Sequence, residues 1–240
     1  MRTSEEWDRW YAKADPWAYD ESVENRVRTA ILMSHLRHAR FRNTLDIGCG
    51  EGLLTNALSR ISESTLGIDI SVKAVERARV RFPLVRFEQG DLLDVVERSD
   101  LQATPFDLIV AAEVLYYLQT DVEREAAVAG LARLGTPQCV YYFSVIVTGS
   151  AGQRRYFTHE EFLALISRHF NVIDAFPSVA RRPRTLDMAL GFIRSPHSRA
   201  ALLEAYTLTR APEKCQHASY LAVKKSAVES GVFSRTGTLQ

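Results

Sequence analysis

Cysteine and histidine are scarce in this sequence. Its three cysteines, Cys49, Cys139 and Cys215, are far apart and odd in number. This pattern argues against a disulfide framework and against a cysteine-rich metal site. The six histidines are scattered along the chain, so no metal site is predicted. Separate thiols of this kind are typical of the reducing cytoplasm, where we expect the protein to be.

Long apolar runs and an excess charge are missing as well. The two most apolar stretches, 106–118 and 139–147, are too short to cross a bilayer. The first residues lack the apolar core of a signal peptide. Because 30 basic residues balance 29 acidic ones, no overall field attracts nucleic acid or a membrane. We therefore expect a small-molecule acceptor as the partner, and a monomer or a homodimer.

The composition allows one sizeable folded unit. The chain has 240 residues, of which 46% are apolar, enough for the core of one α/β domain. We expect an aromatic-rich helical lid over 1–39 and the main domain over 40–225. An insertion at 177–214 is expected just before the last strand, and a loose tail at 226–240.

Residues 44–52 are the stretch around which the rest is organised. The apolar run Thr44–Ile47 ends in three glycines, Gly48, Gly50 and Gly52, and an amphipathic segment follows. This order predicts a strand, a tight turn and a helix. Glycine suits such a turn because a Cβ would block both the bend and the approach of a ligand to the backbone. The helix N-terminus offers free N–H groups to a polar ligand.

The glycine spacing separates two kinds of ligand. Dinucleotide folds usually have G-x-G-x-x-G with a pyrophosphate at the helix end. Here the glycines follow G-x-G-x-G, and Asp46 stands two residues before the first. A carboxylate at that place repels a pyrophosphate and attracts an ammonium group. The alternative is a glycine turn in another kind of α/β protein.

A second acid follows at the distance that an adenosine ligand requires. The strand predicted over 65–69 ends in Asp69, about 20 residues after the glycine turn, where a carboxylate takes the ribose hydroxyls. Ile70 beside it is placed to line the adenine. The alternative for Asp69 is a helix cap alone, since Ser71 and an amphipathic helix come next.

The pattern D-x-G-C-G-x-G resembles the first motif of class I methyltransferases that use S-adenosyl-L-methionine. The resemblance implies that Asp46 lies near the methionine amine and that the turn, Cys49 included, passes close to the cofactor. It also implies that Asp91 accepts from the adenine amino group while Leu92 stacks on the ring. The implied fold is α/β: a Rossmann-like, doubly wound, seven-stranded sheet whose last strand is antiparallel. Gly135-Thr136-Pro137 departs from the Pro-Gly-Gly turn that is common before strand five.

Two segments resemble a subgroup, the nodulation-factor N-methyltransferases. They are Asp15-Pro16-Trp17 near the start and the run 112–118 after the fourth strand. The resemblance implies that an arginine of the helix predicted over 22–37 reaches the cofactor carboxylate; Arg26 is the first candidate and Arg28 the second. A solvated helix face is the alternative for both. Trp17 is expected to belong to the lid over the cofactor, with ordinary core packing as its alternative.

The acceptor chemistry is expected at the end of the fourth predicted strand, residues 105–112. An acid there, Glu113, is costly to bury without a partner, and doubly wound folds place their sites at such strand ends. Glu113, Tyr116 or Tyr117 could orient an amine and take its proton; for a hydroxyl, His159 is the candidate base. An amino-sugar amine is the leading acceptor. An O-methyltransferase and a non-catalytic binding module remain as alternatives, and residues 181–184 are either a phosphate clamp or a solvated basic loop.

Overall fold

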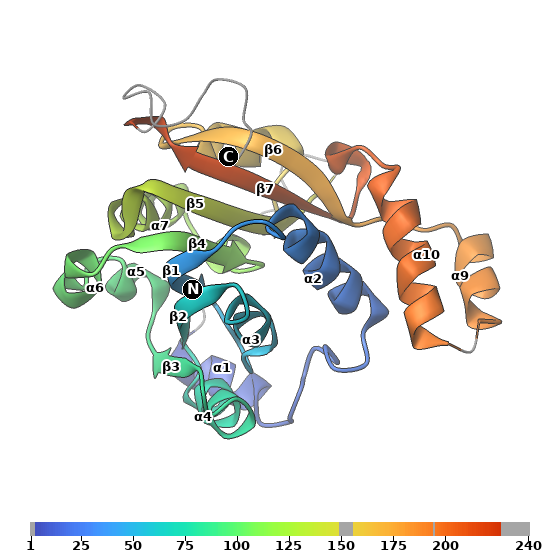
Figure 1. The fold of residues 1–240 in the computed structure, drawn as a ribbon, viewed down its shortest axis with the longest axis horizontal. Helices are drawn as coiled ribbons and strands as arrows, with labels where there is room; N and C mark the ends of the chain where they lie inside the picture. The colour runs from blue at the N-terminus through green and yellow to red at the C-terminus, as the bar shows by residue number, and fades with distance from the viewer. Residues whose placement is uncertain (1–2, 149–155, 194, 227–240) are drawn as a thin grey trace.

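The computed structural model of the protein describes residues 3–148, 156–193 and 195–226. Within them, seven strands form one sheet in the order β3-β2-β1-β4-β5-β7-β6 (Figure 1). Strand β7 is antiparallel to both of its neighbours, and the pairs from β3 to β5 are parallel. The predicted fold class is thereby confirmed. The strands are β1 Phe41–Ile47, β2 Ser62–Asp69, β3 Arg86–Gln89, β4 Phe106–Ala112, β5 Gly135–Ile146, β6 Phe170–Val179 and β7 His217–Lys224.

Helices cover both faces of the sheet (Figure 1). They are α1 Ser4–Trp10, α2 Val23–His35, α3 Leu53–Leu58, α4 Val72–Arg81, α5 Leu92–Val95, α6 Ser99–Ala103, α7 Asp121–Leu134, α8 His159–Ile166, α9 Arg184–Gly191 and α10 Pro196–Leu208, with short 3₁₀ turns η1 Leu115–Tyr117 and η2 Pro212–Lys214. Polar caps start several of them. Ser22 caps α2, Ser71 caps α4, and Thr158 with Glu161 forms the capping box of α8.

The central strands are apolar on both faces, and their side chains alternate between two cores. In β4, Leu108 and Val110 pack with α2, α3 and α10, whereas Ile109 and Ala111 pack with α5, α7 and α8. Alternation with a period of two is a property of extended backbone. The nearly continuous apolar runs of β4 and β5 are therefore explained by helices on both sides.

Two boundaries differ from the sequence-based expectation. Gly135-Thr136-Pro137, expected as a turn, is the start of β5, and the register against β4 shifts between Phe106 and Leu108. The irregularity accommodates a proline, which has no N–H to donate to a ladder. The insertion expected from residue 177 begins later, because β6 continues to Val179. Residues 227–240 of the expected tail lie outside the described residues.

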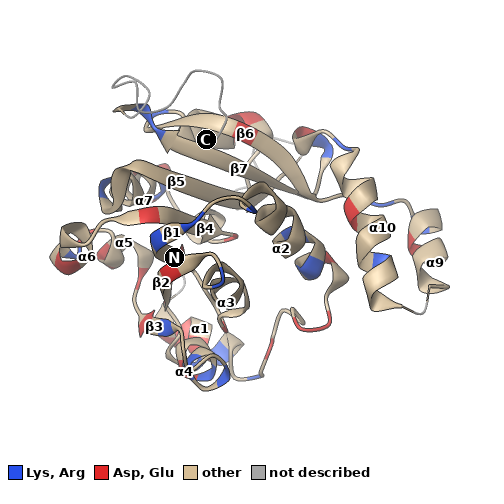
Figure 2. Ribbon diagram, viewed as in Figure 1, with Lys and Arg blue, Asp and Glu red and all other residues tan. Residues whose placement is uncertain are grey.

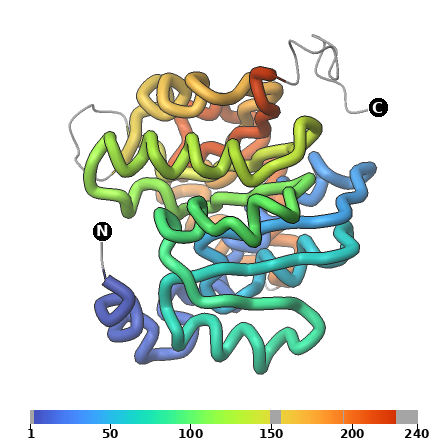
Figure 3. Tube along the Cα trace, turned by 90° about the vertical axis from the view of Figure 1, so that its left-hand side faces the viewer, coloured from blue at the N-terminus to red at the C-terminus, as the bar shows by residue number. Residues whose placement is uncertain are grey.

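Charges of both signs are mixed over the elements, as Figure 2 shows. In the described part of the chain, none of the helices combines the length and the apolar character needed to cross a membrane. The N-terminal helix α1 lies beside α4, at the β3 end of the sheet (Figure 3). It begins with a capping box between Thr3 and Glu6, and its Trp7 is buried.

Gly52 gives a direct test of the turn. Its φ is +82°, and an added Cβ would lie 2.7 Å from Cζ of Phe87. We expect Gly52→Ala to lower the free energy of unfolding by about 2–4 kcal/mol, because a left-handed alanine and a crowded core both cost energy. Urea denaturation measures this loss.

Gly191→Ala is the matched control. Gly191 ends α9, and an added Cβ there would meet nothing within 4 Å. We expect its effect to stay within about 0.5 kcal/mol. Equal losses for the two variants would show that the turn tolerates a side chain.

Candidate active site

A cavity of about 600 Å³ opens at the carboxyl ends of the central parallel strands. The residues that follow β1 and β4, Gly48 and Glu113, both line it. These two strands are neighbours, and the sheet order reverses beside β1. Loops from neighbouring strands leave in opposite directions at such a point and open a crevice. The topology therefore places the cavity where doubly wound folds bind ligands.

The glycine turn forms one wall of the cavity. Gly48, Gly50 and Gly52 all have positive φ, at +74°, +52° and +82°. Gly48, Cys49 and Gly50 line the cavity, and a Cβ on Gly50 would lie 2.9 Å from the hydroxyl of Tyr11. Gly52, predicted to contact the cofactor, is instead packed against Phe87 and is not a lining residue. Its role is to allow the bend.

Two buried carboxylates stand beside the turn. Asp46 accepts a hydrogen bond from Thr55 Oγ1 at 2.7 Å, and Asp69 accepts from the backbone N–H groups of Gly50 at 2.8 Å and Ser71 at 2.9 Å. Burial raises the pKa of Asp46 to about 7 and that of Asp69 to about 6. Hydrogen bonding lowers both pKa values and only partly offsets the burial. Both side chains line the cavity, so a cationic ligand group would favour their ionised forms.

The adenine-side residues that we predicted also line the cavity. Ile70, Asp91 and Leu92 are all among its lining residues. Asp91 additionally caps α5, accepting from the N–H of Leu93 at 2.9 Å, and burial raises its pKa. The cap and a ligand contact are compatible, because a carboxylate has several lone pairs.

The N-terminal segment covers the glycine turn. Trp17 lines the cavity and donates from Nε1 to the hydroxyl of Tyr11 at 3.3 Å. Arg77 of α4 holds this segment, donating to the carbonyl oxygen of Tyr11 at 2.8 Å and pairing with Glu51 at 2.7 Å. The aromatic residues therefore form a cover over the turn that is tied to the domain by α4.

Of the two candidate arginines, the structure brings only the second to the cavity. Arg26 is exposed, donates to the backbone oxygen of Asp20, and does not line the cavity. Arg28, half a turn further along α2, lies in the cavity and donates to Asn25 Oδ1 at 2.9 Å. Residues two apart point to different sides of a helix, so only one of them can face inward.

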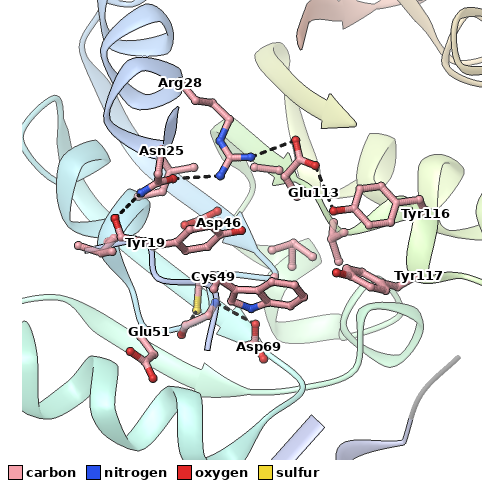
Figure 4. A pocket seen from close by; sticks show the side chains of 18 of the residues that line it. Tyr19, Asn25, Arg28, Asp46, Cys49, Glu51, Asp69, Glu113, Tyr116 and Tyr117 are labelled. Atoms are coloured by element: carbon pink, nitrogen blue, oxygen red, sulfur yellow. Dashed lines mark hydrogen bonds and ion pairs between the residues drawn. The ribbon is translucent and has the colours of Figure 1, made fainter. Parts of the chain in front are cut away.

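Glu113 is the most heavily partnered side chain of the site. Its carboxylate lies 3.3 Å from Arg28 and accepts from Tyr116 at 3.1 Å (Figure 4). It also lies 2.9 Å from Nδ1 of His217 and accepts from the hydroxyl of Ser144. Its φ of +59° is unusual for a residue with a side chain. Such backbone strain is kept where the surroundings impose it, and it gathers at functional sites.

The charge of Glu113 is stabilised by these partners. Burial alone would raise the pKa of Glu113, but His217, Arg28 and Ser144 outweigh it and lower the pKa to about 2. Burial opposes the charge of Arg28, yet Glu113 raises its pKa above the usual value. Glu113 is therefore ionised at neutral pH and is a weak base. This changes the role predicted for it from proton acceptor to holder of other side chains.

The other predicted catalytic residues differ in their placement. Tyr116 and Tyr117 both line the cavity, and the ring of Tyr117 meets Trp7 edge-on at 4.8 Å. His159, expected as a base, is outside the cavity: its Nδ1 is 2.8 Å from the hydroxyl of Tyr220. The histidine that lines the cavity is His217. Sequence reasoning missed it because a single histidine after an insertion carries no motif.

Two of the basic residues at 181–184, Arg181 and Arg182, are engaged within the protein. Arg181 donates to the carbonyl oxygens of Val147 at 2.9 Å and Cys215 at 3.3 Å. Arg182 forms ion pairs with Glu24 at 2.6 Å and Asp187 at 2.7 Å. These contacts indicate that Arg181 and Arg182 have a structural role and do not form a phosphate clamp. Across the described ranges, no group of three or more metal-ligating side chains is found.

The fold and the cavity define the class of protein, and comparison with known proteins gives the family. The sheet order with an antiparallel β7, together with a glycine turn and two acids in one crevice, defines the α/β fold of class I methyltransferases. The family model of nodulation protein S (NodS) matches residues 5–184. The chain therefore belongs to the NodS family.

Similar proteins agree with this placement. Nodulation protein S of Bradyrhizobium diazoefficiens is 32% identical over 145 residues, 60% of this chain and 66% of that protein. A ubiquinone biosynthesis O-methyltransferase of Thiobacillus denitrificans is 31% identical over 110 residues, 44% of each chain. The chain thus spans less than two thirds of the length of either relative. The crystal structure of N-methyltransferase NodS from Bradyrhizobium japonicum WM9 with S-adenosyl-l-homocysteine has a TM-score of 0.69 at 20% identity, covering 94% of this chain and 100% of that one.

The Glu113–Arg28 pair can be tested by its effect on stability. We expect Glu113→Gln to lower the free energy of unfolding at pH 7 by about 3 kcal/mol, because it leaves the Arg28 charge without its partner. The double variant with Arg28→Met should lose less than the sum of the two single variants. Urea denaturation at pH 7 provides the comparison.

The pH dependence has a definite sign. The pKa of Glu113 is lowered from 4.5 to about 2, so its contribution is complete above pH 4.5 and is lost as the pH falls toward 2. The stability gap between the wild type and Glu113→Gln should therefore shrink below pH 4.5. A gap that is constant with pH, or strict additivity in the double variant, would contradict the pairing.

Proposed function

We propose that this protein is a methyltransferase that uses S-adenosyl-L-methionine. The observation that carries the proposal is the convergence of the glycine turn, Asp46 and Asp69 on one cavity. The family membership supports it, as does the NodS crystal structure with S-adenosyl-l-homocysteine. When bound, the cofactor supplies an electrophilic methyl group on a sulfonium.

The residues of the cavity fit this cofactor. The bare backbone at Gly48 and Gly50 leaves room that a Cβ would fill. Asp46 suits the amino group of the methionine part, and Asp69 suits the two ribose hydroxyls. Arg28 is the cation available for the carboxylate, and its guanidinium lies within the cavity. Trp17 and the rest of the N-terminal cover exclude water from the reacting atoms.

For the acceptor, we infer the amine of an amino sugar or a sugar nucleotide in natural-product biosynthesis. The similarity to NodS proteins, one of which is described as an N-methyltransferase, supports an amine. The weaker similarity to a ubiquinone biosynthesis O-methyltransferase supports the alternative, a sugar or phenolic hydroxyl. A binding module that transfers no methyl group is the third possibility. The three possible functions predict different results when methyl transfer to a panel of acceptors is measured.

Calorimetry and radiolabel transfer test the proposal. We expect purified protein to bind S-adenosylmethionine and S-adenosylhomocysteine but not NADH. Labelled methyl should pass to glucosamine or to a chitosan tetramer. Transfer to catechol alone would favour the O-methyltransferase, and binding without transfer would favour the module. Absence of binding would overturn the assignment.

Variants of two aspartates sharpen this test. Asp69→Asn should weaken S-adenosylhomocysteine binding about tenfold or more, since hydrogen bonds to a charged group contribute about 1.5–3 kcal/mol. The control is Asp121→Asn, whose side chain is 97% exposed on α7. It should leave the affinity unchanged. Equal affinities for both variants would remove Asp69 from the ribose site.

The affinity for the same ligand should depend on pH. Asp46 and Asp69 have pKa values raised to about 7 and 6, so both lose protons between pH 5.5 and 8. An ammonium group is attracted by the ionised acids, so binding should tighten about tenfold or more as the pH rises over that range. Asp46→Asn should flatten the upper part of the curve. A pH-independent affinity in the wild type would refute this account.

A further inference from the structure

His217 is a cavity residue to which the proposed function has not yet given a role. It is the first residue of β7, and its side chain is 15% exposed. The structure describes all six histidines of the chain, and His217 is the one among them that lines the cavity. It is held there firmly. The backbone N–H of the neighbouring Gln216 donates to the carbonyl oxygen of Val179 at 2.8 Å, and the carbonyl oxygen of Gln216 accepts from the N–H of Val147 at 2.9 Å.

The two ring nitrogens of His217 have different surroundings. Nδ1 is buried and lies 2.9 Å from Oε2 of Glu113, an ion-pair distance, although the contact does not have hydrogen-bond geometry. A carboxylate at Nδ1 favours the tautomer that carries its proton there, which leaves the lone pair on Nε2. Nε2 is not among the buried unpartnered atoms and has no partner in the described residues, so it keeps accessible surface. This nitrogen is therefore free to accept a proton from a molecule in the cavity.

The neighbouring groups are poor proton acceptors at neutral pH. Glu113 is surrounded by donors, and the charge of Arg28 and the hydrogen bond from Ser144 both lower its pKa. Tyr116 donates to Glu113, and the hydroxyl of Tyr142 is 2.8 Å from that of Ser219; burial raises the pKa of both tyrosines. The titratable and charged groups that line the cavity from the elements around His217 are Glu24, Arg28, Glu113, Tyr116, Tyr142 and Tyr156.

The charge balance also argues against Glu113 as an ammonium site. Arg28 already compensates the carboxylate, so Glu113 attracts a second cation weakly. An amine in this part of the cavity is better held in its neutral form, which is also the form that attacks a methyl group. Such a site needs a side chain that can take up the proton of the acceptor, and the imidazole of His217 stands beside Glu113 in the cavity.

We propose that His217 is the catalytic base of this site, with Glu113 as the positioning residue that sets its tautomer. This rests on the proposed methyltransferase function. An N–H bond of the acceptor ammonium breaks, its proton goes to Nε2, and the electron pair stays on nitrogen as the lone pair that takes up the methyl group. The electron pair of the broken carbon–sulfur bond remains on sulfur in the thioether product.

Matched histidine variants test the proposal by activity. With labelled S-adenosylmethionine and glucosamine or a chitosan tetramer, His217→Asn should lower turnover about 100-fold or more, the usual contribution of a general base. S-adenosylhomocysteine affinity should change less than about threefold. His159→Asn, outside the cavity, should keep wild-type turnover. Imidazole added to His217→Ala should restore part of the rate, which a structural role would not explain.

A spectroscopic measurement needs no acceptor. In wild-type protein labelled with ¹⁵N-histidine, the resonances lost in His217→Asn identify the ring, and we expect its proton on Nδ1 at high pH. Glu113→Gln should weaken that preference. A proton on Nε2 in the wild type would overturn the assignment, whatever the activity.

The outcomes separate the base from the proposed function. Failure of the wild type to bind S-adenosylhomocysteine would refute the function, and the ring tautomer would still decide the pairing with Glu113. Normal binding and transfer with His217→Asn turnover within threefold of wild type would refute only the base. Loss of ligand binding in a folded His217→Asn would place the residue in the cofactor site and overturn its role as base.

Discussion

A buried carboxylate must be compensated by nearby donors and charges, and this requirement shapes the site around Glu113. Its partners come from four separate elements: Arg28 from α2, Tyr116 from η1, Ser144 from β5 and His217 from β7. The carboxylate thus joins α2 to β7. Together with the strained backbone at Glu113, it makes this end of the cavity depend on the whole sheet being assembled.

The glycine turn forms the other wall of the cavity, where the acids are not fully compensated by the protein. There the backbone itself is the contact surface, and the acids beside it are only partly stabilised. Burial raises the pKa values of Asp46 and Asp69, so a cationic ligand would complete their environment. The lowered pKa of Glu113 and the raised values of Asp46 and Asp69 divide the cavity into a part whose charges are already compensated and a part whose acids a ligand would compensate.

The N-terminal cover connects these two parts. Arg77 and Glu51 fasten it near the glycine turn, whereas Trp7 reaches Tyr117 beside the Glu113 loop. Its aromatic residues are close to both walls without belonging to the sheet. This explains why so many aromatic residues precede the first strand. They supply a large contact area over a cavity that the glycine turn and several acids line from the sheet side.

The sequence by itself determined the glycine turn and the two acids near the ends of β1 and β2, because these follow from local patterns and short chain spacings. The helix that begins after Ser71 was predicted for the same reason. The seven-stranded sheet was implied by the resemblance to class I methyltransferases. Only the tertiary structure decided between Arg26 and Arg28 and between His159 and His217. Which side chain reaches a cavity depends on helix rotation and on strands distant in sequence, and neither leaves a local signal.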